Sequence, residues 1–234
     1  ANAPVAHIDT QSRRVRGVVL QSGERIPADV VIMNGDASHT PRLLGEPGKE
    51  LTVDERSLSG LVFLIGVRRR LEGIHHHNVY FSENYAEEFR QLFDEQRIPG
   101  DPTVYVNVPS RSDTTVAPDG GETLFLMINA PATGEQWDAS RIAAARKAVF
   151  ARLGASGFPD IEQDIAVEHA VTPQSLAERF SMPGGAIYGA HSHGWRKAFF
   201  RPPNKDRHCA GLYYAGGSAH PGGSRWRKAD LSAA

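Results

Sequence analysis

The chain has 234 residues, of which 26 are Lys or Arg and 27 are Asp or Glu, so its formal net charge is −1. This balance gives the chain no overall electrostatic attraction to nucleic acid. Its single cysteine, Cys209, excludes an internal disulfide and any metal site built from several cysteines. No apolar stretch reaches the roughly 18 residues that a membrane-spanning helix needs.

Two strands joined by a hairpin are predicted near the amino terminus. They cover Val15 to Leu20 and Arg25 to Met33, with a tight turn at Ser22-Gly23. The second apolar run leads into Asn34-Gly35-Asp36-Ala37, a pattern typical of a buried strand that delivers a polar loop. Asp36 is therefore either a turn-forming residue or part of a site.

The middle of the chain contains four further apolar runs of strand length. Polar or Gly-rich connections separate them, which predicts a mostly antiparallel sheet. The runs are Leu61 to Val67, Asn78 to Phe81, Thr103 to Val108 and Thr123 to Asn129.

Three helices are predicted around these strands. Ser82 can cap the first, whose aromatic residues share one face. Asp138 can cap the second, which is expected to end at Gly154. The third begins at Thr172-Pro173, with proline in the first helical position.

The segment from Gly211 to Gly223 is the most informative stretch. A short apolar run leads into two glycine pairs that are separated by Ser-Ala-His-Pro. Paired glycines let backbone amides approach a phosphate or a polar ring edge, although a plain turn explains them equally well. The segment Gly216 to His220 begins like Gly-x-Ser-x-Gly, with Ser218 as the serine. His220 occupies the final position, which must be small, so a serine nucleophile is not expected.

Histidine and arginine clusters give weaker signals. Side chains alternate between the two faces of a strand, so at most two imidazoles of His75-His76-His77 can share a face. His191 and His193 form a second pair of the same kind. Two imidazoles without a further ligand make a poor metal site, so none is predicted. The basic runs Arg68 to Arg70 and Arg225 to Lys228 suit either solvated ends or phosphate contacts. No Gly-x-Gly-x-x-Gly is present, so a main dinucleotide-binding turn would lie outside this chain.

Short segments in a fixed order run along nearly the whole chain. They are Gly17-Val18-Val19-Leu20, Ala28-Asp29-Val30-Val31, Leu64-Ile65-Gly66-Val67, His76 to Ser82, Asp101 to Val106, Ala117-Pro118-Asp119-Gly120, Thr172-Pro173, Gly184 to Gly189, Phe200-Arg201-Pro202 and Gly211 to Gly223. In number and order they resemble the C-terminal half of the phytoene desaturase-like carotenoid desaturases, FAD-dependent relatives of the amine oxidases.

The resemblance implies an α/β (α+β) fold, as part of a two-domain FAD flavoprotein. Residues 1–45 and 205–234 would be segments of the Rossmann-like FAD-binding domain. Residues 46–204 would form a substrate-binding domain, a mixed or antiparallel sheet with flanking helices. The N-terminal Rossmann half is absent from the sequence, so we expect a fragment of a longer protein.

The resemblance also places FAD beside the C-terminal glycine-rich turn. Tyr188 and Asp36 are candidate flavin or substrate neighbours, and an ordinary core position is the alternative for Tyr188. No residue is selected as a catalytic base, and no metal is expected. The implied cofactor-binding residues are Gly216, Gly217, Ser218, His220, Pro221, Gly222 and Gly223.

The implied activity is that of an FAD-dependent oxidoreductase acting on CH–CH bonds of a carotenoid. A hydride passes to the flavin N5 while the adjacent carbon loses a proton. The substrate is a long apolar polyene (phytoene, diapophytoene or a hydroxylated carotenoid), which implies a cytoplasmic protein with peripheral membrane contact. Two alternatives stay open: another amine-oxidase-like FAD oxidoreductase on an apolar substrate, and a non-catalytic module that binds an apolar ligand or a membrane surface.

Two departures from the family pattern carry expectations of their own. Because the N-terminal Gly-x-Gly-x-x-Gly half is missing, we expect the chain to bind FAD weakly or not at all by itself and to be inactive alone. Its start, Ala-Asn-Ala-Pro without Met, is what we expect of a piece cut from a longer protein. After Gly223 the family continues with small or apolar residues, whereas this chain reads Ser-Arg-Trp-Arg-Lys. We expect that tail to be a reading-frame slip or an artificial end.

Overall fold

The computed structural model describes residues 2–190 and 203–219. The chain forms two compact units. Unit 1 comprises Ala1–Ser57, Phe180–Pro183 and Ile187–Ala234, and unit 2 comprises Leu58–Arg179 and Gly184–Ala186. Helices and strands mix in the chain, as the α/β (α+β) fold class predicts.

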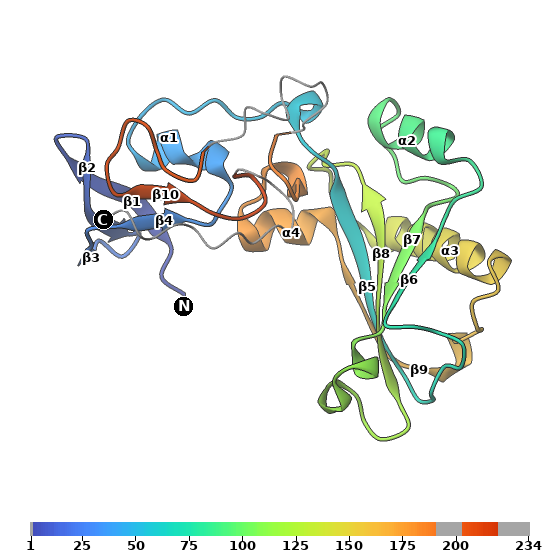
Figure 1. Cartoon of the computed structure of the whole chain (residues 1–234). Coiled ribbons are helices and arrows are strands. Elements are labelled where there is room, and N and C mark those ends of the chain that lie inside the picture. The colour runs from blue at the N-terminus through green and yellow to red at the C-terminus, as the bar shows by residue number, and fades with distance from the viewer. Residues whose placement is uncertain (1, 191–202, 220–234) are drawn as a thin grey trace. The chain divides into compact units, whose positions relative to one another are not determined.

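Unit 1 contains two small sheets (Figure 1). The first has three antiparallel strands: β1 (Val5–Gln11), β2 (Arg14–Leu20) and β3 (Arg25–Pro27). The second pairs β4 (Val31–Met33) with β10 (Leu212–Tyr214) in parallel. The short helix α1 (Thr40–Leu43) follows β4. The buried core of the unit consists of Ile8, Val15, Cys209, Leu212, Tyr214 and Ala219.

The predicted strand from Arg25 to Met33 is wrong as a single element, because the structure divides it into β3 and β4. The antiparallel hydrogen bonds to β2 continue past Pro27 to Ala28, whose N–H donates to Arg16 O at 3.0 Å. Val31 N instead donates to Gly211 O at 2.9 Å, which directs the chain into parallel pairing with β10. The hairpin turn between β2 and β3 is confirmed, with Gly23 at a φ of +86°.

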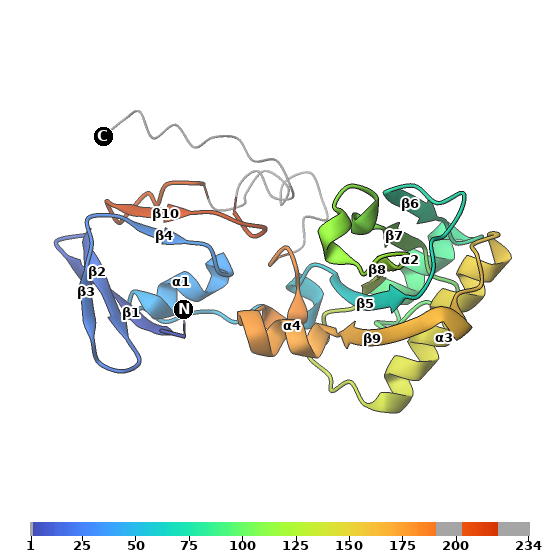
Figure 2. The ribbon, with the colours of Figure 1, turned by 90° about the horizontal axis from the view of Figure 1, so that it is seen from below.

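Unit 2 is built on a five-stranded antiparallel sheet in the order β6-β7-β8-β5-β9 (Figures 1 and 2). The predicted antiparallel arrangement is confirmed. Strand β9 was not expected from the sequence, nor was β1 in unit 1. The five strands are β5 (Ser59–Val67), β6 (His77–Tyr80), β7 (Val104–Asn107), β8 (Glu122–Ala130) and β9 (Ile165–Val171).

Helix α3 (Ala139–Ala155) covers one face of this sheet. Its Ala145, Val149 and Leu153 are buried against alternate strand residues, as the period-2 pattern of a strand requires. The other helices are α2 (Tyr85–Phe93) and α4 (Pro173–Phe180). Short 3₁₀ turns cover Ala37–His39, Val53–Glu55, Pro109–Arg111, Thr114–Val116, Glu162–Asp164 and Pro183–Gly185.

The helix ends confirm one predicted cap and correct two. Asp138 caps α3 by accepting from Arg141 N at 2.8 Å, as predicted. Ser82 does not cap α2, because it donates to the buried carboxylate of Glu88 at 2.8 Å, and Asn84 takes the capping position. Helix α3 also continues past Gly154 to Ala155.

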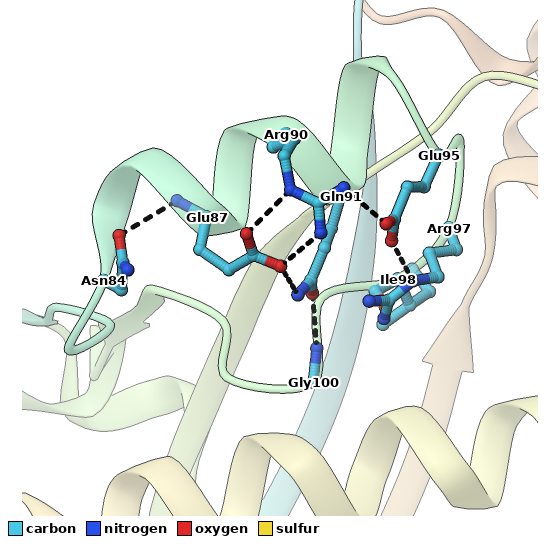
Figure 3. Close-up of polar contacts among 8 residues, drawn as sticks. All are labelled: Asn84, Glu87, Arg90, Gln91, Glu95, Arg97, Ile98 and Gly100. Atoms are coloured by element: carbon cyan, nitrogen blue, oxygen red, sulfur yellow. Dashed lines mark hydrogen bonds and ion pairs between the residues drawn. The ribbon is translucent and has the colours of Figure 1, made fainter.

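The solvent side of α2 has its own polar network (Figure 3). Arg90 donates to Glu87 at 2.7 Å and 2.8 Å and to Glu95 at 2.6 Å, and Arg97 donates to Glu95. The hydrogen bond from Arg90 lowers the pKa of Glu87 to about 2. The charges along this helix therefore neutralise one another.

A buried carboxylate lies at the start of β8. Glu122 is 1% exposed, and its Oε2 accepts from Leu71 N at 3.0 Å. Its Oε1 lies 3.0 Å from Arg111 Nε and 3.6 Å from Arg70 Nη1. Removing one member of such a buried ion pair lowers the free energy of unfolding strongly, because the charge that remains is partly shielded from solvent and has lost its partner.

We expect Glu122→Ala to lower the free energy of unfolding by about 3 kcal/mol, because it leaves Arg111 without its buried partner. Asp9→Ala is the matched control, since it breaks an ion pair with Arg25, whose side chain is 71% exposed. That control should change stability by no more than about 1 kcal/mol. Urea unfolding followed by circular dichroism measures both, and equal losses would contradict the buried-pair argument.

Asp206 accepts three hydrogen bonds, one of them from Tyr214 of β10. Its Oδ2 accepts from the Tyr214 hydroxyl at 2.7 Å, and its Oδ1 accepts from the amides of His208 and Cys209, both at 2.7 Å. Desolvation works to raise the pKa of Asp206, but these hydrogen bonds outweigh it and lower the pKa below the ordinary value. Burial and the neighbouring carboxylate raise the pKa of Tyr214.

Because the folded-state pKa of Asp206 is lowered, its stabilising contribution is present above the unfolded pKa near 4 and is lost as the pH falls through the folded pKa. We expect Asp206→Asn to cost about 1 kcal/mol at pH 7 and almost nothing at acid pH. Unfolding free energies measured from pH 7 to pH 2 test this. A constant difference between variant and wild type at all pH values would contradict it.

Candidate functional site

The two parallel strands of unit 1 end at the same edge. Tyr214 at the end of β10 is in register with Met33 at the end of β4. The loops that leave these strands, residues 34–37 and 215–219, therefore start side by side, and they contain the predicted site residues Asp36 and Gly216. Ligands of open α/β sheets bind outside the carboxyl ends of parallel strands.

Hydrogen bonds join the two loops. Ala215 N donates to Met33 O at 2.9 Å. The Ser218 hydroxyl accepts from Ala37 N at 2.9 Å, across 181 positions of sequence, and lies 3.4 Å from Gly35 O. Ser218 is thus engaged by two backbone groups, which fits a structural role for its hydroxyl and not that of a nucleophile.

Asp36 anchors the first loop. It is 8% exposed, and its Oδ1 accepts from Ser38 N at 2.9 Å and from Ser38 Oγ at 2.6 Å. This geometry caps the 3₁₀ turn that follows. The structure therefore shows Asp36 as a turn-forming residue at the edge of the site.

A third segment, which contains Tyr188 and Gly189, completes the arrangement. Tyr188 N donates to Ser57 Oγ at 3.0 Å, and Ser57 N donates to Gly189 O at 2.8 Å. These two hydrogen bonds tie the segment to Ser57. Tyr188 itself is 44% exposed, so its ring lies at the surface and not in a core.

Three glycines make this close approach possible. A Cβ on Gly189, whose φ is +65°, would lie 2.7 Å from Asp36 Oδ2 and 2.9 Å from the Cβ of Ser218. One on Gly216, at φ +91°, would lie 2.7 Å from Asn34 Oδ1. One on Gly217 would lie 2.8 Å from the carbonyl oxygen of residue 187. A side chain at 189 or 217 would push the segments apart, whereas one at 216 would require the Asn34 side chain to move and would strain the backbone at its positive φ.

The arrangement brings together Asp36, Tyr188, Gly216, Gly217 and Ser218 of the predicted residues. His220, Pro221, Gly222 and Gly223 lie outside the described residues, as do His191, His193 and the run Arg225 to Lys228. Sequence reasoning missed Ser57 as a site residue, and no local pattern marks it, because its partners lie 131 positions away.

At this surface a ligand can come close to the protein backbone. Gly216 is exposed and Gly217 and Ser218 are half-buried, so small residues of one loop face solvent beside the Tyr188 ring. Such a surface suits a planar ring or a phosphate. The contacts described for these three segments include no paired acid and base of the kind that proton transfer needs.

Residues 2–190 and 203–219 lack the features of two other classes of site. No group of three or more His, Cys, Asp or Glu side chains in this part of the chain could hold a metal ion. Within the same described ranges, no helix has the length and apolar character needed to cross a membrane.

Comparison with known proteins gives no matching family model, but it does give curated relatives. The chain is 37% identical to the 1-hydroxycarotenoid 3,4-desaturase of Flavobacterium sp. (strain P99-3) over 224 residues, which is 94% of this chain and 45% of the relative. It is 35% identical to the zeta-carotene-forming phytoene desaturase of Myxococcus xanthus, over 94% of this chain and 44% of that protein. Hydroxyneurosporene desaturase of Rubrivivax gelatinosus is 37% identical over 89% of the chain and 41% of its own length.

Among solved structures, an oxidoreductase from Methanosarcina mazei matches 92% of this chain and 43% of its own, with a TM-score of 0.51 and 16% identity. At that identity the match concerns the fold alone, and it agrees with the predicted fold class. The chain spans a little under half the length of the curated relatives that it matches. Over nearly all of its own length, the chain is similar in sequence to carotenoid desaturases and oxygenases.

Proposed function

We propose that this chain is part of an FAD-dependent carotenoid desaturase. The observation that carries the proposal is the identity of 35–37% to three desaturases named for carotenoid substrates, over 89–94% of the chain. These relatives are more than twice as long as the matched region. The proposal therefore includes further polypeptide that supplies the Gly-x-Gly-x-x-Gly turn absent from this sequence.

FAD is the proposed cofactor, and the loops at the ends of β4 and β10 are its proposed contact surface. The amides of Gly216 and Gly217 can approach a ring or a phosphate because neither residue has a side chain. The hydroxyl of Ser218 and the carboxylate of Asp36 hold the two loops in place. When bound, FAD would supply the two-electron acceptor that removal of a hydride from a substrate carbon requires.

The proposed domain assignment follows the same logic. Residues 1–45 and 205–234 belong to the FAD-binding domain, and residues 46–204 form the substrate-binding domain. The clustering of Ala1–Ser57 with Ile187–Ala234 in one compact unit supports this proposal. Unit 2, with its five-stranded sheet, contains most of the remaining chain.

A carotenoid has little polar surface, so its recognition depends on apolar burial, at about 25 cal/mol per Å². Because such a substrate dissolves in a membrane, we propose that the protein is cytoplasmic with peripheral membrane contact. Exposed Phe81 (65%) and Tyr85 (54%) are suitable residues for that contact. The relatives' names include both hydroxylated and unmodified carotenoids, so the comparisons leave the substrate open between these two.

Reconstitution tests the proposed function. The chain is co-expressed with the remaining part of the Flavobacterium relative in cells that make acyclic carotenoids. We expect flavin absorbance in the purified complex and polyenes with additional conjugated double bonds in the cell extract. The chain expressed alone should carry neither property. A complex that contains flavin but leaves every polyene unchanged would contradict the desaturase assignment, and flavin bound by the chain alone would contradict the need for further polypeptide.

Gly189→Ala tests the proposed cofactor surface in the same complex. The new Cβ meets Asp36 and Ser218, so we expect the loops to separate and flavin affinity to fall at least about fivefold, equivalent to about 1 kcal/mol. Gly23→Ala is the matched control, because Gly23 also has a positive φ but has nothing within 4 Å of the added carbon. Flavin titration compares the two variants, and equal affinities would argue against a cofactor surface at these loops.

A further inference from the structure

The second face of the five-stranded sheet, opposite α3, has side chains that the core does not use. On β7, Val104 and Val106 are fully buried on the α3 side, whereas Tyr105 and Asn107 alternate with them and are half-buried. On β5, Leu64 points to this second face and is 39% exposed. Of the side chains on this second face, Val62 of β5 is buried at 9% exposed, whereas those of β6 and β7 are exposed or half-buried.

Strand register places one apolar residue from each strand in a single row across this face. Neighbouring strands lie about 4.8 Å apart, so five strands make a row roughly 19 Å long. The row follows the strand order seen in Figure 1. In order from β6 to β9 it consists of Val79, Tyr105, Met127, Val62 and Val171.

The adjacent row on the same face changes in character along its length. Its centre is apolar, with Phe125 beside the Tyr105 ring at a centroid distance of 6.3 Å. Its ends are polar, and neither row contains Asp, Glu, Lys or Arg. From β6 to β9 the second row consists of His77, Asn107, Phe125, Leu64 and His169.

A small polar corner closes the apolar row at the β6–β7 edge. His77 Nδ1 lies 2.7 Å from the Tyr105 hydroxyl and 3.2 Å from Asn107 Nδ2. Asn107 Nδ2 also donates to His76 O at 3.1 Å, which fixes that atom as the amide nitrogen. Since two donors converge on Nδ1, we assign it as an acceptor, and neutral His77 has its proton on Nε2.

This assignment leaves both a donor and an acceptor in the corner. His77 Nε2–H can donate, and the Tyr105 oxygen has a lone pair that can accept. A hydroxyl group is the simplest ligand group that uses both. A hydrocarbon end placed there would leave these polar groups without partners, and that penalty is how polar sites discriminate against analogues that lack the matching group.

We propose that this face binds an acyclic polyene with a hydroxyl group at its end, and that His77, Tyr105 and Asn107 are specificity-determining residues that hold the hydroxyl. The inference rests on the proposed function and extends it to one substrate class. The absence of Asp, Glu, Lys and Arg from both rows suits an uncharged ligand, the single-file apolar row matches an extended chain, and the polar corner matches its one polar group. Neither a membrane surface nor a second copy of the chain explains why one donor–acceptor pair lies at the end of the row.

The test measures binding by the 234-residue chain itself, without flavin. Two probes are presented from detergent micelles: an acyclic 1-hydroxycarotenoid and the same polyene without the hydroxyl. We expect the hydroxylated probe to be retained roughly fivefold more tightly, as one hydrogen-bonded group allows. Tyr105→Phe and His77→Phe should each reduce this preference to less than about twofold while retention of the hydrocarbon probe stays the same or rises.

His169→Phe is the matched control, because it makes the same change on the same face at the opposite edge of the sheet. It should leave the preference intact. Met127→Glu, which places a charge in the centre of the apolar row, should abolish retention of both probes, with circular dichroism confirming that the fold persists.

Three outcomes would overturn the inference. The first is equal retention of the two probes. The second is a preference that Tyr105→Phe leaves unchanged, and the third is a dimer that Met127→Glu dissociates. None of them affects the proposed function, which depends on flavin-dependent desaturation by the reconstituted complex and is measured separately.

Discussion

The three-residue parallel pairing of β4 with β10 is the constraint on which the candidate site depends. It joins segments from opposite ends of the chain and aligns Met33 with Tyr214. Because both strands end at one edge, the loops that follow must share the same space, and glycine at 189, 216 and 217 is what lets them do so. Without this pairing, Ser218 would not reach the amide of Ala37.

The two units carry different parts of the proposed chemistry. In unit 1, backbone and small residues form a surface suited to a ring or a phosphate. In unit 2, α3 covers one face of the antiparallel sheet and leaves uncharged, largely apolar rows on the other. A desaturase needs both, since the cofactor supplies the electron acceptor and the protein must align a substrate with few polar handles. Proton transfer is the one requirement for which the described residues identify no group.

Local signals in the sequence were sufficient for most of the fold. Asp138 was recognisable as a cap because it bonds an amide three residues away. Strand β9 was missed because Glu168 interrupts its apolar pattern; in the structure Glu168 accepts from Arg146 of α3 at 2.8 Å. Ser82 likewise does not cap α2, although its position in the sequence suggested that it would, because its hydroxyl donates to Glu88. The same contrast holds for the candidate site. Its glycines could be recognised from the local sequence, whereas Ser57 could not, because its contacts are formed only in the tertiary structure.

Hydrogen–deuterium exchange in the reconstituted complex, with and without flavin, tests the central claim most directly. If the loops after β4 and β10 form the cofactor surface, the amides of residues 216–218 gain protection when flavin binds, and those of the distant Ser22-Gly23 turn do not change. Unchanged exchange at residues 216–218 in a complex that demonstrably contains flavin would contradict the account.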